Sequence, residues 1–201
     1  MPDLFPSDAR TAQVTRGTSE TQIEVAVNLD GTGNAEVDTG LGFLDHMLTA
    51  LAKHARFDLE LECDGDLDVD DHHTAEDCAL ALGAAIDQAL GERRGIRRFG
   101  HACAPLDEAL ARVVVDFSGR PSAHVDLGFR RERIGDIATE NLTHVFVSLA
   151  TTARMTLHVD VLRGENDHHR AEAAFKALAL ALRHAVAQDG GSDVPSTKGV
   201  L

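Results

Sequence analysis

Two copies of one pattern stand in this chain: Asp71-His72-His73-Thr74-Ala75-Glu76 and Asp167-His168-His169-Arg170-Ala171-Glu172. Each copy follows a similar upstream segment, which carries His46 in the first case and His144 in the second. The upstream histidine lies 26 residues before the first histidine of the pair in one copy and 24 residues before it in the other. This agreement in order and spacing indicates a tandem duplication of a unit of about ninety residues.

The hydrophobic periodicity predicts matching elements in the two halves. Strands are expected over residues 23–29, 35–38, 57–63, 113–117, 123–129 and 155–162, and helices over residues 43–51, 78–90, 142–154 and 168–187. The segments 30–33 and 118–121 are predicted to be the turns of two hairpins. Helices with one apolar stripe alternate with strands that have one apolar face, so we expect helices that cover one side of a sheet in two similar halves.

The composition excludes several classes of protein. Among 201 residues, 19 are Lys or Arg and 33 are Asp or Glu, which gives a formal net charge of −14. This charge argues against nucleic acids and anionic membranes as partners, because both require clustered cations. No run of about 18 apolar residues exists, and residues 1–10 have no signal-peptide pattern. The three cysteines lack CxxC spacing, so we expect a soluble, cytoplasmic protein without a disulfide framework.

The duplicated pattern has the spacing of a divalent-metal site. In each copy the first histidine lies four residues before the glutamate and the second lies three residues before it, so at a helix start these side chains share one face. Asp71 and Asp167 are expected to cap these helices. Adjacent helical side chains diverge by about 100°. Two metal ions, each taking one histidine from each pair, would resolve this geometry.

Eight side chains are therefore candidate donors, enough for two metal ions with four protein ligands each. They are His46, His72, His73, Glu76, His144, His168, His169 and Glu172. The donor types do not select the metal, because a histidine-rich site binds zinc or copper more tightly than manganese. A structural metal is the alternative to a catalytic one. Five further histidines, at positions 54, 101, 124, 158 and 184, are expected to be structural when each is considered alone.

In so acidic a chain the concentrated cations are informative. We expect Arg93 and Arg94 to be solvated surface charges. Arg120 lies in a tight turn with Gly, Pro and Ser, and Lys198 lies in a similar C-terminal segment. An arginine fork, a lysine and a serine hydroxyl are the donors that a phosphate monoester needs. A metal site beside such donors indicates a small phosphorylated substrate.

Together these motifs resemble the imidazoleglycerol-phosphate dehydratase family. The resemblance rests on residues 40–47, 71–77, 95–100, 118–121, 166–172 and 195–199, and it runs from about residue 16 to residue 201. It implies an α+β fold, an α/β sandwich made by tandem duplication of a unit whose helices pack on one face of a mixed four-stranded sheet. The chain would be one catalytic domain with halves over about 10–95 and 96–190 and a substrate-binding tail over 191–201. Residues 130–139 follow no pattern that we recognise.

The resemblance also implies an activity, that of a hydro-lyase of histidine biosynthesis. Such an enzyme eliminates water from imidazole glycerol phosphate to give imidazole acetol phosphate. Two Mn²⁺ ions per active site would be held by the eight donors above, in a homo-oligomer of 24 subunits with active sites at the subunit interfaces.

The matching motifs also assign residues that contact the substrate: Glu20, His54, Arg98, Arg120, Lys176, Ser196 and Lys198. Register alone selects Arg98 over Arg97. Glu20 is the hypothesis for the group that transfers the proton, and metal-bound water is the alternative.

Two other classes of protein fit part of the pattern. A dinuclear metal hydrolase would use the same donors but would hold a phosphoester on its metal ions. A metal-storage protein or a metal-stabilised shell would need the donors but neither Arg120 nor the C-terminal segment. The dehydratase interpretation uses both sets of residues.

Overall fold

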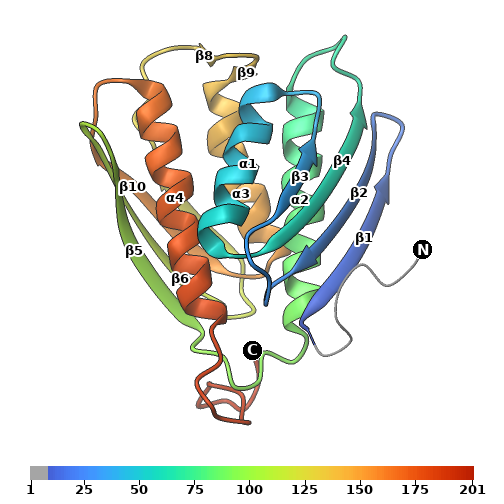
Figure 1. The fold of residues 1–201 in the computed structure, drawn as a ribbon, viewed down its shortest axis with the longest axis vertical. Coiled ribbons are helices and arrows are strands. Elements are labelled where there is room, and N and C mark those ends of the chain that lie inside the picture. The colour runs from blue at the N-terminus through green and yellow to red at the C-terminus, as the bar shows by residue number, and fades with distance from the viewer. Residues whose placement is uncertain (1–8) are drawn as a thin grey trace.

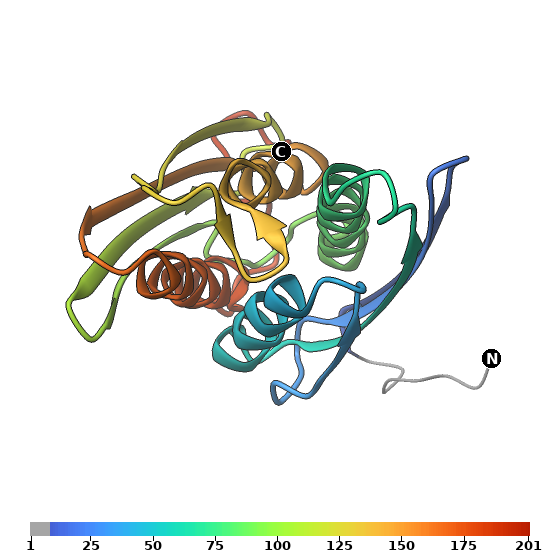
Figure 2. The same cartoon turned by 90° about the horizontal axis from the view of Figure 1, so that it is seen from above.

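The computed structural model describes residues 9–201, so most of the N-terminal segment that was searched for a signal peptide lies outside the described part. Two four-stranded sheets form the outer layers, and four helices lie between them (Figures 1 and 2). Each half of the chain contributes one sheet and two helices. The apolar faces of the helices and the inner faces of both sheets bury one continuous core.

The first half runs β1 Thr11–Gly17, β2 Thr21–Asn28, β3 Ala35–Asp38, α1 Gly42–Ala55, β4 Asp58–Gly65 and α2 His72–Leu90. The second half runs β5 Phe99–Leu106, β6 Ala109–Asp116, β7 Ser122–Asp126, α3 Thr139–Thr152, β10 Thr156–Arg163 and α4 Asp167–Val186. A short hairpin, β8 Arg133–Ile134 and β9 Ile137–Ala138, precedes α3. The sheet orders are β1-β2-β4-β3 and β5-β6-β10-β7, and both sheets are mixed. The predicted duplicated α+β fold is therefore confirmed.

The two predicted hairpins are wrong, although their strands exist. β3 pairs in parallel with β4, which lies between β3 and β2, and β7 pairs in parallel with β10 in the same way. The carboxylate of Asp58, the first residue of β4, accepts hydrogen bonds from the backbone of Thr32, Gly33 and Asn34. These bonds tie the connection to the start of β4. The turn residues were recognised correctly, but a turn signal does not specify which strand the next strand will join.

The strands β1 and β5 were not predicted. β1 has the sequence Thr-Ala-Gln-Val-Thr-Arg-Gly, and its side chains are only partly buried. In β5 the positions that face the core hold mostly small residues, among them Gly100 and Ala104. Both are edge strands, so one long side of each lacks a strand partner and the apolar alternation that marks a central strand is weak.

The expectation that Arg93 is a solvated charge is also wrong. Its side chain is 2% exposed. The guanidinium donates to the carbonyl oxygens of Phe117 and Ala153 and to the carboxylate of Asp87. Arg93 therefore ties the end of the first half to the second half, because a fork of five donors can satisfy several acceptors at once. Arg94, by contrast, is exposed and pairs with Glu92.

The helix α4 lies directly against β5, and this contact depends on Gly100. A Cβ atom at position 100 would overlap the carbonyl oxygen of Ala181 and would lie 2.9 Å from the backbone nitrogen of Ala185. Both of these atoms belong to the helix backbone, which cannot move without shifting α4 as a whole. The glycine thus allows the close approach of helix and sheet.

We expect Gly100→Ala to destabilise the fold by about 1–3 kcal/mol, the usual cost of an overpacked contact. Chemical denaturation measures this directly. Cys103→Ala is the matched control, since Cys103 lies on the same strand and is exposed. Equal free energies of unfolding for Gly100→Ala and the control would contradict the role assigned to this contact.

Candidate metal centre

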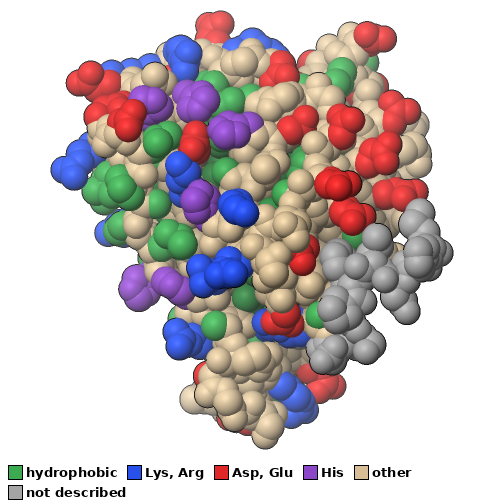
Figure 3. Space-filling model, in the orientation of Figure 1, with side chains coloured by type: hydrophobic (Ala, Val, Ile, Leu, Met, Phe, Trp, Pro, Cys, Tyr) green, Lys and Arg blue, Asp and Glu red, His purple; other side chains and the backbone are tan. Residues whose placement is uncertain are grey.

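The four long helices all begin at the same end of the molecule (Figure 1). The helix α1 packs against α4, and α2 packs against α3, so each pair joins one helix from each half. Side chains from the first two turns of helices in different halves of the sequence therefore meet. Figure 3 shows histidine side chains grouped with Lys and Arg on the part of the surface above α1 and α4, whereas acidic side chains predominate over the first sheet.

His46 of α1 meets His168 and Glu172 of α4. The Nε2 atoms of His46 and His168 each lie 3.2 Å from Oε2 of Glu172. We call these three residues the α1–α4 cluster. Their donor atoms all lie within 4.8 Å of one another, so the three side chains together could hold one metal ion.

The second group consists of His72 and Glu76 of α2 and His144 of α3, and we call it the α2–α3 cluster. Nε2 of His144 lies 3.2 Å from Oε1 of Glu76, and Nε2 of His72 lies 3.5 Å from Oε2 of Glu76. These donor atoms also lie within 4.8 Å of one another. The imidazoles of His72 and His144 are stacked, with ring centroids 5.2 Å apart. Each cluster thus takes a histidine and a glutamate from one repeat and a histidine from the other.

His73 and His169 join neither cluster within one chain. The ring planes of His72 and His73 are inclined by 69°, and those of His168 and His169 by 88°. Only the first histidine of each pair belongs to a cluster, as expected if neighbouring helical side chains point in different directions. The prediction that each ion takes one histidine from each pair is consequently not met inside one subunit.

Carboxylates hold these two diverging histidines. Nδ1 of His73 lies 3.0 Å from Asp66, and Nδ1 of His169 lies 2.7 Å from Glu108. Each hydrogen bond raises the pKa of its histidine. The pKa of Glu108 falls to about 2, because the backbone of Asn166 and the ring of His169 both donate to it.

The nitrogen that faces the carboxylates or amides is Nδ1 in His72, His73 and His169. For His72 the partner is Oδ1 of Asn141, at 2.9 Å. An acceptor oxygen on Nδ1 places the ring proton there, which leaves the lone pair on Nε2. Metal-binding histidines commonly have such a partner on the nitrogen that does not bind the metal. His72 therefore has both the position and the tautomer that suit a divalent metal ion, and the other cluster members have the position.

Glu172 stays ionised in the α1–α4 cluster. Burial raises its pKa, but hydrogen bonds from Lys176 and His46 outweigh burial and lower that pKa to about 2. Nζ of Lys176 lies 2.6 Å from Oε1 of Glu172, one helical turn away. Burial, together with the charge of Lys176, lowers the pKa of His54.

Asp71 and Asp167 do not cap their helices as predicted. Asn166 caps α4 by accepting from the backbone of His168, and the side chain of Asp71 makes no cap hydrogen bond. Both aspartates are buried, and both bind residues 130–138 instead. Asp71 accepts from the backbone of Ala138, and Asp167 accepts from the backbone of Arg130 and Arg131. The segment that matched no sequence pattern is thus the β8–β9 hairpin and its approach, fixed between the two histidine pairs.

The candidate phosphate contacts lie far from both clusters. Arg98 binds Asp116 and the carbonyl oxygen of Pro195, and the backbone of Lys198 donates to the hydroxyl of Ser196. The segment after α4 lies at the end of the molecule opposite the helix starts (Figure 1). The intervening helix α4 has 20 residues and is therefore about 30 Å long.

The remaining predicted contacts are divided between the two ends. Arg120 hydrogen-bonds to Ser118 in the turn that the C-terminal residue covers, and it therefore belongs with Arg98 and the tail. Glu20 lies near the histidine end, with Oε1 3.8 Å from Nε2 of His73. The side chain of Arg98 donates a hydrogen bond to the tail, as does that of Arg94.

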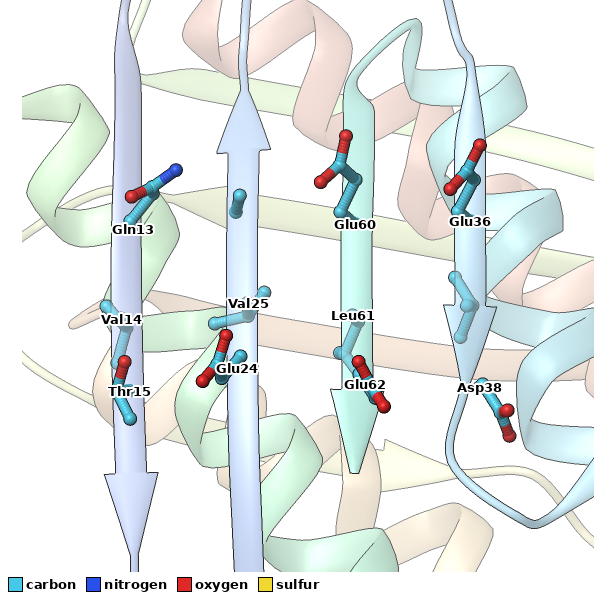
Figure 4. Close-up of a pocket in the computed structure, with 12 residues that line it drawn as sticks. Gln13, Val14, Thr15, Glu24, Val25, Glu36, Asp38, Glu60, Leu61 and Glu62 are labelled. Atoms are coloured by element: carbon cyan, nitrogen blue, oxygen red, sulfur yellow. The ribbon is translucent and has the colours of Figure 1, made fainter. Parts of the chain in front are cut away.

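A hollow unrelated to the histidines lies elsewhere on the described surface. It has a volume of about 800 Å³ and lies on the outer face of the first sheet (Figure 4). Five carboxylates line it: Glu24, Glu36, Asp38, Glu60 and Glu62. The register places Glu24 opposite Glu62 and Glu36 opposite Glu60. Like charges in such pairs repel, so this concave face offers no cation that would hold a phosphorylated substrate.

None of the helices in residues 9–201 combines the length and the apolar character needed to cross a membrane.

Comparison with known proteins identifies relatives over nearly the whole chain. A family model described as imidazoleglycerol-phosphate dehydratase matches residues 39–182. The imidazoleglycerol-phosphate dehydratase of Phaffia rhodozyma is 61% identical, with 96% of each chain covered. The protein of that name from Phytophthora nicotianae is 62% identical over 97% of this chain, and the chain spans only 43% of that longer protein.

Two solved structures share the fold. The enzyme of Pyrococcus furiosus in complex with (S)-C348 has a TM-score of 0.81 and 39% identity, and the alignment covers 94% of this chain and 100% of that one. The imidazoleglycerol-phosphate dehydratase of Staphylococcus aureus has a TM-score of 0.80 and 35% identity, with 89% and 99% covered.

The pKa of Glu172 leads to a pH prediction for the metal-free protein. A glutamate has a pKa of about 4.3 in an unfolded chain, so a folded value of about 2 makes its carboxylate stabilising above pH 4.3. That contribution is lost as the pH falls from about 4.3 towards 2. Over this range we expect the free energy of unfolding to fall more steeply for the wild type than for Glu172→Gln. Denaturant titrations in the presence of a chelator test this, and parallel pH profiles would contradict it.

Proposed function

This chain belongs to the imidazoleglycerol-phosphate dehydratase family, and we propose that its two histidine clusters hold the metal ions with which it acts. The enzyme is a hydro-lyase of histidine biosynthesis that converts imidazole glycerol phosphate to imidazole acetol phosphate. The observation that carries the metal proposal is the convergence of six donor atoms into two groups, in a protein of this family.

Each ion takes three donors from one subunit. His46, His168 and Glu172 bind one ion, and His72, Glu76 and His144 bind the other. His73 and His169 face away from both clusters, so we assign them as the fourth donors of clusters in neighbouring subunits. Each ion then has one histidine from each pair, the arrangement that the sequence suggested. The bound ions are Mn²⁺, two per active site, and they supply Lewis-acid chemistry and a template for the imidazole and diol of the substrate.

The phosphate is bound at the opposite end of a subunit. The residues that bind it, which we call the phosphate-binding residues, are Arg98, Arg120, Ser196 and Lys198. The hydrogen bond from Arg98 to the carbonyl oxygen of Pro195 positions the tail, residues 191–201. The phosphate and the reacting carbon belong to the same substrate molecule, so the residues that bind them must lie in one active site. About 30 Å of helix separates the two ends in one chain. One subunit therefore contributes the clusters, and another contributes the phosphate-binding residues.

The active site is therefore complete only in the assembled oligomer. We propose a homo-oligomer of 24 subunits with active sites at the interfaces, in the cytoplasm. Each subunit is a single catalytic domain with halves over about 10–95 and 96–190. A closed symmetric assembly repeats one interface at every site, so each site has the same set of contributed residues.

Other side chains near the clusters have roles in binding and proton transfer. Glu20 is placed by the turn between β1 and β2, where Thr18 accepts from its backbone N–H, and it lies beside His73. It is the group that transfers the proton. Lys176, one turn beyond Glu172 on α4, and His54, in the last turn of α1, contact the substrate. The distant phosphate contacts orient the substrate, which lowers the entropic part of the barrier.

A hydrolase that holds a phosphoester on its metal ions fits the geometry less well. In the proposed assembly Arg98, Arg120, Ser196 and Lys198 bind the phosphate, whereas a hydrolase that holds the phosphate on its metal ions has no use for these separate residues. Inorganic phosphate distinguishes the two, because it binds the metal-free dehydratase at the remote site but binds a hydrolase only with metal present.

We expect removal of the metal to abolish dehydration of imidazole glycerol phosphate and Mn²⁺ to restore it. The assay follows formation of imidazole acetol phosphate by chelator-stripped protein before and after the metal is added. Metal content is measured on the same sample. Protein that has bound Mn²⁺ and still forms no product would refute the proposed function.

We expect Glu20→Gln to lower kcat roughly 100- to 10,000-fold, the range for loss of a general acid or base. The change removes a titratable group and keeps the shape, so Mn²⁺ content stays unchanged. Glu24→Gln is the control, because Glu24 is exposed on the next strand and faces the outer hollow. Equal kcat values for the two variants would dismiss the role of Glu20.

A further inference from the structure

One buried position beside the histidines holds residues of different chemistry in the two repeats. Asn141 precedes His144 by three residues, and Phe43 precedes His46 by three residues. The two residues are therefore equivalent in the duplicated unit. Both are buried beside the first histidine of a pair, Asn141 beside His72 and Phe43 beside His168. An amide can donate and accept hydrogen bonds at once, whereas a phenyl ring offers neither function.

On the α2–α3 side, Asn141 completes a chain of hydrogen bonds. Its Nδ2 donates to Oδ2 of Asp71 at 2.9 Å, and its Oδ1 accepts from Nδ1 of His72 at 2.9 Å. Asp71 is 4% exposed and also accepts from Ala138 and Arg133. The carboxylate fixes which way the amide points, and the amide fixes the tautomer and rotation of the imidazole. Nε2 of His72 is thereby aimed at the cluster by a buried network.

On the α1–α4 side, the corresponding chain is interrupted. The ring of Phe43 meets the ring of His168 edge-on, with centroids 5.1 Å apart, and supplies no hydrogen-bond acceptor. Asp167 is 2% exposed, and its Oδ2 binds the backbone of the hairpin approach. Its Oδ1 has no hydrogen-bond partner among residues 9–201. The equivalent aspartate is thus present, but the amide that would connect it to the histidine is replaced by Phe43.

We propose that the α2–α3 cluster binds its metal ion more tightly and fills first, with Asn141 as the residue that positions His72. This inference rests on the proposed metal binding. An imidazole that already has the required tautomer and orientation loses less freedom when it binds an ion. Loss of such an outer partner typically weakens metal binding 10- to 100-fold. The β8–β9 hairpin contributes to the positioning of His72, because it holds Asp71 in place and Asp71 orients Asn141.

The test is a titration of metal-stripped, full-length protein with Mn²⁺, in which free Mn²⁺ is followed by its electron paramagnetic resonance signal. The wild type should show a tight and a weak class of sites in equal number. Asn141→Leu, which removes both hydrogen bonds at similar volume, should weaken the tight class about 10- to 100-fold and leave the weak class unchanged. Ser148→Ala is the control, because Ser148 is buried on the same helix and belongs to neither cluster.

The outcomes separate the two proposals. A wild type that binds no Mn²⁺ would overturn the proposed function as well as this inference. Two classes that Asn141→Leu leaves unchanged, or weakens equally, would overturn the inference alone. A second measurement needs no variant: wild-type crystals exposed to less than one Mn²⁺ per subunit should show the stronger anomalous scattering peak between His72, Glu76 and His144. Equal peaks, or a stronger peak beside Glu172, would overturn the inference.

Discussion

The packing of helices from one repeat against helices from the other is the constraint on which the rest of the structure depends. The helices α1 and α4 pack together, as do α2 and α3, in the layer between the two sheets. Small buried residues permit this, since α4 alone buries seven alanines. All four helices begin at one end, so the packing brings histidines and glutamates of different repeats within 4.8 Å. A single repeat would hold neither cluster.

The clusters lie near helix N-termini, whose partial positive charge disfavours a metal ion. The negative charge of the carboxylates offsets this effect, and Glu172 is held ionised by Lys176 and His46. Two buried aspartates bind the β8–β9 hairpin, which spans both histidine pairs. The clusters are thus supported from outside by the same short segment, although only the α2–α3 side has a complete hydrogen-bonded path from Asp71 to the imidazole.

The duplicated pattern predicted the repeat, the four helices and the candidate donors, because helical spacing and repeat spacing are local properties of the sequence. Strand partners were not predictable in the same way. The turns at residues 30–33 and 118–121 are real, but β3 and β7 each join a strand from later in the chain. Asp71 and Asp167 have the residue type of helix caps, and only the tertiary structure shows that the hairpin uses them instead. Nothing local marks Arg93 as buried, because its acceptors come from the other half of the chain.

The metal clusters and the phosphate-binding residues lie at opposite ends of a subunit. The central claim is therefore that each active site combines the clusters of one subunit with the phosphate-binding residues of another. Co-expression of two inactive variants tests it most directly. His72→Ala lacks one metal donor, and the double variant Arg120→Ala and Lys198→Ala lacks the phosphate contacts. Mixed assemblies should recover up to about a quarter of wild-type activity, since each half of a site is drawn independently from the two subunit types. Mixed assemblies that contain both variants and show no activity above that of the separate variants would contradict the account.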